Sequence, residues 1–267
     1  MKKITLTPRE GEKYLVLEAD CITPDNFAGK TIDEIKELKV WEGNTTWPLG
    51  KFFDVSGETA ATAAEQAIVI NGNVPRVKYI GSKMTDGAVL VKGDVDMYVG
   101  AWMKGGSIIV KGNADHFAGI QMEGGDLVIE GNAGNYLGAS YRGDWRGMKG
   151  GNIVVKGSAG SDAGEYMIGG TITVYGNVNI QTGIHAGRAV GPKEPGGKII
   201  VHGNAVGRVG GQMTRGTIYV LGTIEDMLAG FAKTGTQEAE IEGKKYTFDV
   251  YTGDRAEAGK GTLYVKA

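Results

Sequence analysis

A 13-residue unit that recurs seven times between residues 81 and 222 constrains the fold more than any other feature of this chain. The units read GSKMTDGAVLVKG, GAWMKGGSIIVKG, GIQMEGGDLVIEG, WRGMKGGNIVVKG, GEYMIGGTITVYG, GPKEPGGKIIVHG and GGQMTRGTIYVLG. Their closing glycines lie 19 residues apart in the regular steps, with seven and eight extra residues before Gly157 and Gly203. A fixed period of this length indicates a repeat architecture.

Each unit holds one short strand of alternating pattern, and such a strand cannot bury its own face. The units must therefore stack, strand upon strand. The 46 glycines suit sharp corners, because glycine adopts positive φ without a Cβ penalty. We therefore predict an all-β fold: a right-handed parallel β-helix of about seven to eight coils, each advancing about 4.8 Å, with a small α/β N-terminal segment.

Three residue columns follow from the repeat register. Alternation points inward the two positions of each strand that are apolar in every unit. A methionine at a fixed position in six units fills the interior. Small polar residues after the closing glycines predict a side-chain ladder at one corner. The outward middle column is also largely apolar, which indicates a surface covered by the termini or by another protein. Its members are Leu90, Ile109, Val128, Val154, Thr173, Ile200 and Tyr219.

Two insertions leave the same corner, ASYRGDWRG after Gly138 and IHAGRAVGPKEPG after Gly183. They start two steps apart, about 10 Å, so we expect one bipartite protrusion. Arginine and aromatic side chains anchor protein interfaces, and insertions often mark the binding face of a repeat protein, although tolerated surface loops are the alternative. The predicted interface comprises Tyr141, Arg142, Trp145, Arg146, His185, Arg188 and Lys193, with the column residues Leu90, Ile109, Val128, Val154, Ile200 and Tyr219.

The chain is expected to divide into three parts. Residues 1–66 form a capping segment with strands at 3–7 and 14–18 and a helix at 31–38, where Thr31 and Glu34 match a capping box. Residues 67–229 carry the glycine repeat. Residues 230–267 supply closing strands, predicted at 246–251 and 261–266.

Composition and motifs argue against several functions. The net charge of −2 offers no basic excess for nucleic acid. No apolar run reaches the roughly 20 residues of a membrane span, and no signal-peptide core is present, which predicts a cytoplasmic protein.

Cys21 stands alone, and the three histidines show no metal-ligand spacing, so we expect no catalytic, cofactor-binding or metal residue on this chain. A paired carboxylate site drawn from Asp144, Asp162 and Glu165 is the alternative, although corner and surface solvation explains most of these residues.

The seven repeats, together with the opening MKKITLTPREGEKYLVLEADCITPDNFAGKTIDEIKELKVWEGN, resemble the C subunit of formylmethanofuran dehydrogenase from methanogenic archaea. The resemblance implies a non-catalytic scaffold subunit of an oxidoreductase complex that reduces CO2 and forms N-formylmethanofuran in methanogenesis. It implies a pterin-metal subunit, an amidohydrolase-like subunit and ferredoxin-like subunits as partners. The tungsten or molybdenum pterin, the iron–sulfur clusters and a binuclear metal site would lie on those partners.

Other interpretations remain open at this point. The glycine repeat also resembles the C-terminal domain of glutamate synthase large subunits, and a bacterial formyltransferase/hydrolase complex contains a similar subunit; the opening stretch favours the dehydrogenase. A carbohydrate-active β-helix enzyme is a third alternative. A cluster of one charge on an outward face would support it, but this column is mixed: Lys92, Lys111, Glu130, Lys156, Tyr175, His202 and Leu221.

Overall fold

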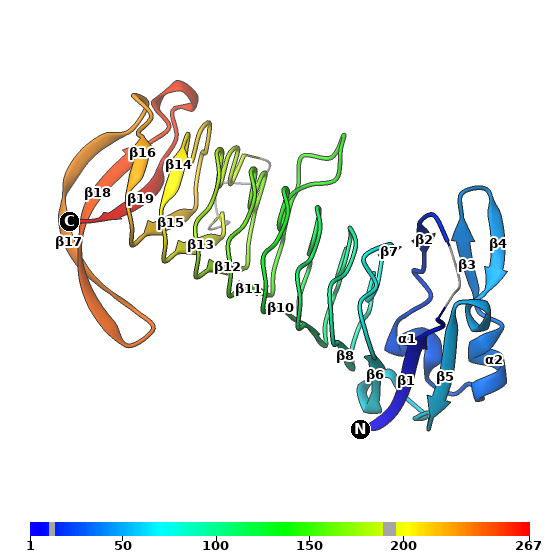
Figure 1. Cartoon of the computed structure of the whole chain (residues 1–267). Helices are drawn as coiled ribbons and strands as arrows, with labels where there is room; N and C mark the ends of the chain where they lie inside the picture. Colours follow the sequence, from blue (N-terminus) through cyan, green and yellow to red (C-terminus); the bar gives the residue numbers. More distant parts are fainter. Residues whose placement is uncertain (11–13, 189–195) are drawn as a thin grey trace.

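A computed structural model describes residues 1–10, 14–188 and 196–267 (Figure 1). The fold is mostly β, with the short helices α1 (Pro24–Phe27) and α2 (Ile32–Lys36) and the 3-10 turns Leu49–Lys51, Ala63–Glu65 and Arg255–Glu257. The strands are β1 (Lys2–Pro8), β2 (Leu17–Glu18), β3 (Lys39–Glu42), β4 (Thr45–Pro48), β5 (Phe53–Gly57), β6 (Gln66–Ile70), β7 (Val77–Lys78), β8 (Ala88–Val91), β9 (Ser107–Val110), β10 (Asp126–Ile129), β11 (Asn152–Val155), β12 (Thr171–Val174), β13 (Lys198–Val201), β14 (Ala205–Gly207), β15 (Thr217–Val220), β16 (Ile224–Asp226), β17 (Ala232–Ile241), β18 (Lys244–Gly253) and β19 (Gly261–Lys266).

One large sheet dominates the molecule. Its thirteen strands follow the order β17-β18-β19-β15-β13-β12-β11-β10-β9-β8-β6-β1-β5. The repeat strands pair in parallel and in register, so that Leu127 stands between Ile108 and Ile153. The inward apolar pairs are buried, and the six repeat methionines are at most 1% exposed. The predicted interior is thereby confirmed.

The architecture differs from the right-handed parallel β-helix that the repeats predicted. The sheet is mixed, because β1 pairs with β5, and β18 with both β17 and β19, in antiparallel fashion. Elsewhere the repeat units are joined by isolated bridges such as Ala114 to Ala133 and by the two-stranded sheet β14–β16. The physical reason lies at the two ends of the sheet. β1 and β19 continue the parallel pairing, and β5 and β18 then run beside them in the opposite direction.

The predicted polar ladder follows the closing glycines. The backbone amide of Asn113 donates to Oδ1 of Asp94 at 2.7 Å, and the amide of Asn132 donates to Oδ1 of Asn113 at 2.8 Å. The same contact recurs through Asn204, which accepts from the amide of Thr223 at 2.9 Å. Each unit thus satisfies a corner amide of the next, which fixes the register of the stack.

The N-terminal segment continues the large sheet beyond β6, the strand that pairs with the first repeat strand, β8. β1 pairs in parallel with β6, and a second sheet, β4-β3-β2-β7, joins three strands of this segment to β7 beyond it. Helix α2 begins after Thr31, whose hydroxyl accepts from the amide of Glu34 at 3.3 Å while Glu34 accepts from the amide of Thr31 at 2.7 Å. The predicted capping box is confirmed, although the helix ends two residues earlier than expected.

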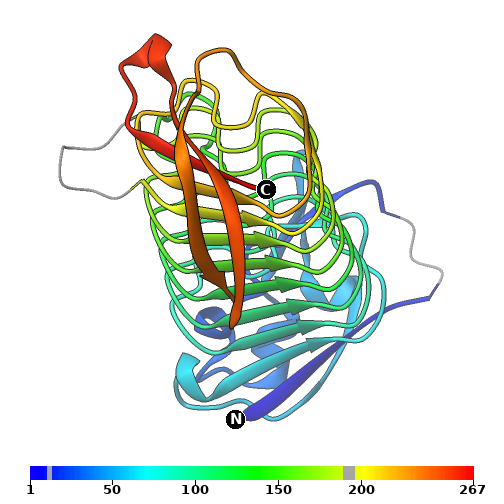
Figure 2. The ribbon, with the colours of Figure 1, turned by 90° about the vertical axis from the view of Figure 1, so that its left-hand side faces the viewer.

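The C-terminal hairpin β17–β18 covers one end of the outward apolar column (Figures 1 and 2). Ile200 packs there with Ile241 and Phe248, and Tyr219 lies against the same cluster. Leu90, Ile109, Val128 and Val154 are half-buried on the uncovered strands. Among the described residues, no helix has both the length and the apolar character needed to cross a membrane.

Candidate functional site

Two rows of side chains run along the turn layer, on the border of the stack away from the labelled repeat strands in Figure 1. All of their members have positive φ, between 49° and 67°. This conformation is uncommon outside glycine and concentrates at functional positions. The first ridge is Tyr79, Tyr98, Phe117, Tyr136, Asp162, Gln181 and Arg208, and the second ridge is Lys83, Trp102, Gln121, Tyr166, His185 and Gln212.

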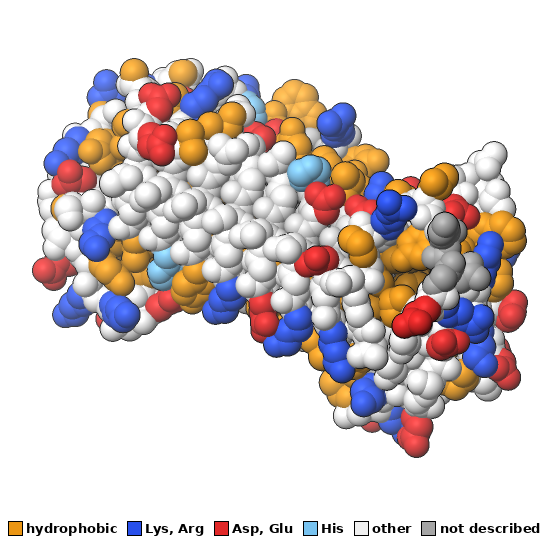
Figure 3. Space-filling view, in the orientation of Figure 1, with side chains coloured by type: hydrophobic (Ala, Val, Ile, Leu, Met, Phe, Trp, Pro, Cys, Tyr) orange, Lys and Arg blue, Asp and Glu red, His pale blue; other side chains and the backbone are white. Residues whose placement is uncertain are grey.

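Aromatic rings stack along both ridges. On the first ridge, ring centroids are 4.7 Å apart from Tyr79 to Tyr98, 5.0 Å from Tyr98 to Phe117 and 4.8 Å from Phe117 to Tyr136. Tyr166 and His185 stack at 4.5 Å on the second ridge. In the orientation of Figure 1, hydrophobic side chains and a histidine are visible along this border, above a band with few charges (Figure 3).

A trough lies between the ridges, and its floor is formed by the residue that follows the corner glycine of each unit, as Ala139 follows Gly138. Six of the seven floor residues are small or apolar and buried: Ser82, Ala101, Ile120, Ala139, Ile184 and Gly211. The seventh is Glu165, which is only partly buried. The floor therefore carries a carboxyl group in one unit of the stack.

The first insertion lies across the trough and is anchored by Asp144. The side-chain amide of Gln121 donates to Oδ2 of Asp144 at 2.7 Å and to the carbonyl oxygen of Arg146 at 2.9 Å. Gln121 in turn accepts from the indole of Trp102 at 2.7 Å. Burial raises the pKa of Asp144, but hydrogen bonds from Gln121, the Trp145 amide and Arg146 outweigh it, so the pKa is lowered overall.

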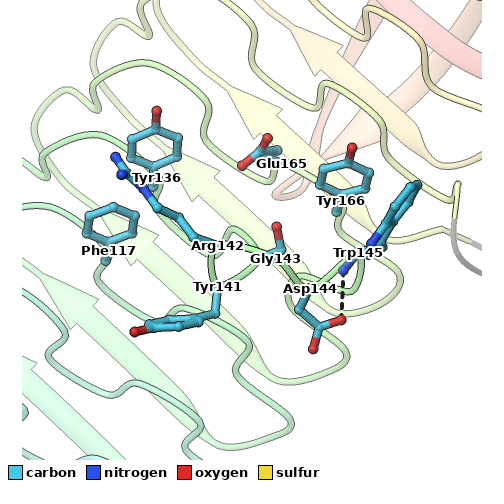
Figure 4. A pocket seen from close by; sticks show the side chains of 10 residues that line it. Phe117, Tyr136, Tyr141, Arg142, Gly143, Asp144, Trp145, Glu165 and Tyr166 are labelled. Atoms are coloured by element: carbon cyan, nitrogen blue, oxygen red, sulfur yellow. Dashed lines mark hydrogen bonds between the residues drawn. The ribbon is translucent and has the colours of Figure 1, made fainter.

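The insertion and the ridges enclose an open hollow of about 340 Å³ (Figure 4). Its lining residues are Phe117, Tyr136, Ser140, Tyr141, Arg142, Gly143, Asp144, Trp145, Glu165 and Tyr166. In the part of the chain that the structure describes, the side chains of Arg142 and Glu165 make no hydrogen bond or ion pair. Burial, and to a lesser extent the charge of Asp162, raise the pKa of Glu165 to about 7.

Glu165 should make the stability of the chain depend on pH. Its pKa is about 7 in the folded chain and 4.5 in an unperturbed glutamate. The folded state therefore holds the proton more tightly, and this stabilisation is complete below pH 4.5 and is lost as the pH rises to about 7. We expect Glu165→Gln to gain stability relative to the parent chain across this window and to keep that gain at higher pH.

Urea midpoints of both chains, measured from about pH 4.5 to about pH 8, test this expectation. Glu238→Gln on β17 is the matched control, because Glu238 is exposed. A difference between the Glu165→Gln and parent midpoints that stays constant with pH would contradict the environment described for Glu165.

The structure places the predicted interface residues as follows. Tyr141 and Trp145 are 43% and 62% exposed, and Arg142 and Arg146 lie on the same loop. In the second insertion His185 contacts Tyr166, whose ring lies 6.3 Å from that of Trp145.

Tyr166 thus connects the two predicted loops. Arg188 lies beside His185 at 3.0 Å and Glu257 at 3.5 Å. Lys193 falls outside the described residues. The interface itself stays a prediction.

Sequence reasoning missed the ridges, although a signal was present. An aromatic residue stands two positions before the glycine at the corner in Y-I-G, Y-V-G, F-A-G and Y-L-G, starting at residues 79, 98, 117 and 136. The proposed carboxylate set is only partly assembled, since Asp144 is committed to the loop and Asp162 shares the environment of Glu165. Within the described ranges, no three His, Cys, Asp or Glu side chains are placed to hold a metal ion.

Comparisons with known proteins point to one group of enzymes, although no family model matches the chain. The chain is 51% identical over 97 residues to the C subunit of tungsten-containing formylmethanofuran dehydrogenase 2 from Methanothermobacter thermautotrophicus, covering 36% of each chain. It is 54% identical over 139 residues to the equivalent protein of Methanococcus maripaludis, covering 52% of this chain and 50% of that one. The C subunit of molybdenum-containing formylmethanofuran dehydrogenase 1 from Methanosarcina barkeri is 43% identical over 97 residues, covering 36% and 32%.

The matches thus span about a third to a half of the length of these curated relatives. A solved structure matches more completely. It is a chain of the formyltransferase/hydrolase complex from Methylorubrum extorquens, crystallised in complex with methylofuran, and the alignment has a TM-score of 0.82 at 26% identity over 98% of this chain and 99% of that one. The resemblance predicted from the repeats and the opening stretch is thereby confirmed: this chain is a relative of the C subunits of formylmethanofuran dehydrogenases of both the tungsten and the molybdenum types.

Proposed function

We propose that this chain is a structural subunit of a formylmethanofuran dehydrogenase complex, which reduces CO2 and attaches the formyl group to methanofuran. The chain would hold catalytic partners in place and carry no active site of its own. The tungsten or molybdenum pterin, the iron–sulfur clusters and the binuclear metal site would belong to a pterin-metal subunit, ferredoxin-like subunits and an amidohydrolase-like subunit. The proposal places the complex in the cytoplasm.

One observation carries this proposal: over 98% of its length, with a TM-score of 0.82, the chain matches one member of a complex of several proteins. The relatives named as C subunits of formylmethanofuran dehydrogenase direct the proposal to that enzyme. Exposed aromatic residues on the first insertion agree with a partner surface, because tyrosine and tryptophan are frequent interface anchors.

Native co-purification from the source cells tests the proposal. We expect mass spectrometry to identify a pterin-metal subunit and an amidohydrolase-like subunit, and metal analysis to detect tungsten or molybdenum. A chain that purifies as a monomer without these partners would contradict it.

A second candidate is a subunit of a formyltransferase/hydrolase complex, which the match to the Methylorubrum extorquens structure favours. The same purification separates the two candidates. A purified complex that contains neither tungsten nor molybdenum would favour the second candidate.

The first insertion supplies a sharper test of the partner surface. We expect the double variant Tyr141→Ser and Trp145→Ser to lower the affinity for the partner proteins about 30-fold, because truncating two exposed aromatic anchors removes about 2 kcal/mol in total. Leu15→Ser is the matched control, since Leu15 is 76% exposed and lies far from the loop in sequence. Quantitative pull-down with the reconstituted partners is the measurement. Unchanged affinity would remove the loop from the interface.

A further inference from the structure

The strongest unassigned feature is the hollow in which Glu165 replaces the apolar floor of the trough. At the equivalent positions Ala139 and Ile184 are buried, so the preceding and following units fill this place with hydrocarbon. A half-buried carboxyl group without a partner loses hydration and gains nothing in return. A cationic group bound above it would restore that loss.

The walls of the hollow suit such a cation. Figure 4 shows the rings of Tyr136 and Tyr166 on the two sides of Glu165, one from each ridge, with Trp145 beside Tyr166. Aromatic faces attract ammonium groups within about 6 Å and also stack on flat rings. The combination of a carboxyl floor and aromatic walls therefore favours an amine attached to a planar group.

The rim of the hollow carries a positive charge, opposite to that of the Glu165 carboxylate. The guanidinium group of Arg142 lies on the Phe117 and Tyr136 side of the hollow (Figure 4). No ion pair or hydrogen bond of its side chain is found in the described ranges, 1–10, 14–188 and 196–267. Guanidinium groups bind carboxylates through two parallel hydrogen bonds, so a free one at the rim of a site selects an anionic group on the ligand.

We propose that this hollow binds a small molecule built on a flat ring that carries both a primary ammonium group and a carboxylate, with Glu165 taking the ammonium and Arg142 the carboxylate. The volume of about 340 Å³ falls in the range of small-molecule sites, which begins at about 300 Å³. The aromatic ridges are held in place by their backbone turns and by the stacking of neighbouring rings. The hollow shares Tyr141 and Trp145 with the proposed partner surface, so ligand binding is measured on the chain without partners.

Binding should depend on pH through Glu165. Its ionised form holds the ammonium group, so affinity should rise as the pH increases from about 5 to about 8. The other titratable or charged groups that face the site are Asp144, Asp162, Arg142, Tyr136, Tyr166 and His185. Burial and Arg188 lower the pKa of His185, and Arg208 opposes the upward shift that burial gives the pKa of Asp162.

The test uses 4-(aminomethyl)benzoate as the probe and the full chain as the receptor. Calorimetry at about pH 8 should show saturable binding, whereas benzoate and benzylammonium, each lacking one charged group, should bind at least about tenfold more weakly. The Trp145 indole signal, assigned with Trp145→Phe, should shift in nitrogen-edited NMR spectra only with the bifunctional probe.

Variants locate the two charges. Glu165→Gln should weaken the probe about tenfold or more and abolish the rise in affinity with pH, and Arg142→Gln should weaken it while leaving that rise in place. Glu130→Gln is the control, because Glu130 pairs with Lys111 on the strand side of the stack.

Equal binding of benzoate, an unchanged affinity in Glu165→Gln, or no binding at all would overturn the proposal. The three-probe comparison decides the question on the parent chain even if a variant fails to fold.

Discussion

Replacing Gly125 with alanine is expected to lower the free energy of unfolding by about 3 kcal/mol. Two causes add. Gly125 has φ of +80°, a conformation that alanine adopts only under strain, and a Cβ built there lies 2.6 Å from the carbonyl oxygen of Gly106 and 2.6 Å from Cε of Met103. The carbonyl belongs to the preceding repeat unit, so the clash would separate two adjacent units rather than displace one flexible side chain.

Gly143→Ala is the matched control for strain alone, since Gly143 has φ of +87° and a Cβ there meets nothing within 4 Å. It should cost about 1 kcal/mol. Urea unfolding followed by far-UV circular dichroism measures both. Equal losses in the two variants would mean that the units are not held as closely as described.

Replacing Phe248 with alanine is expected to lower the free energy of unfolding by about 4 kcal/mol, because its ring is fully buried. The ring lies edge-on to Tyr219 at 5.5 Å and to Tyr264 at 5.8 Å, and it packs with Ile200 and Ile241. The variant should loosen the hairpin β17–β18 from the repeat strands before the stack itself unfolds.

Limited proteolysis of the hairpin and thermal unfolding measure the two effects. Thr247→Ala is the control, because Thr247 is the exposed neighbour on β18 and should change stability by less than about 0.5 kcal/mol. A Phe248→Ala chain whose hairpin remains as resistant to protease as the parent would show that other contacts fix it.

The sequence predicted the repeat strands and the interior well, because both depend on local periodicity. Alternation in strands such as β9 identified the buried pair Ile108 and Val110 directly. The same periodicity predicted a more regular fold than the structure has. It contained no sign that β1, β5, β17 and β18 would join the repeat strands in one mixed sheet, since pairing between strands far apart in sequence leaves no local pattern.

The candidate site was harder to predict for a different reason. Tyr136 and Tyr166 occupy positions that the repeat rule left free, and only the positive φ at each brings their rings to the two sides of one trough. Glu165 was considered as one of three acidic residues, but its isolation among buried floor residues required the register of the stack. The tie between Gln121 and Asp144 spans 23 residues and follows no motif.

The ridges also present recognition residues at fixed positions along the stack. Because backbone turns fix each ridge and floor position, the number of a repeat unit specifies a distance along the axis, and the residue type specifies what is recognised there. A side chain in one repeat unit can therefore recognise one group of a ligand while the residues of the neighbouring units stay unchanged. Glu165 is the charged member of a floor whose other positions, such as Ser82 and Ala101, are small and buried.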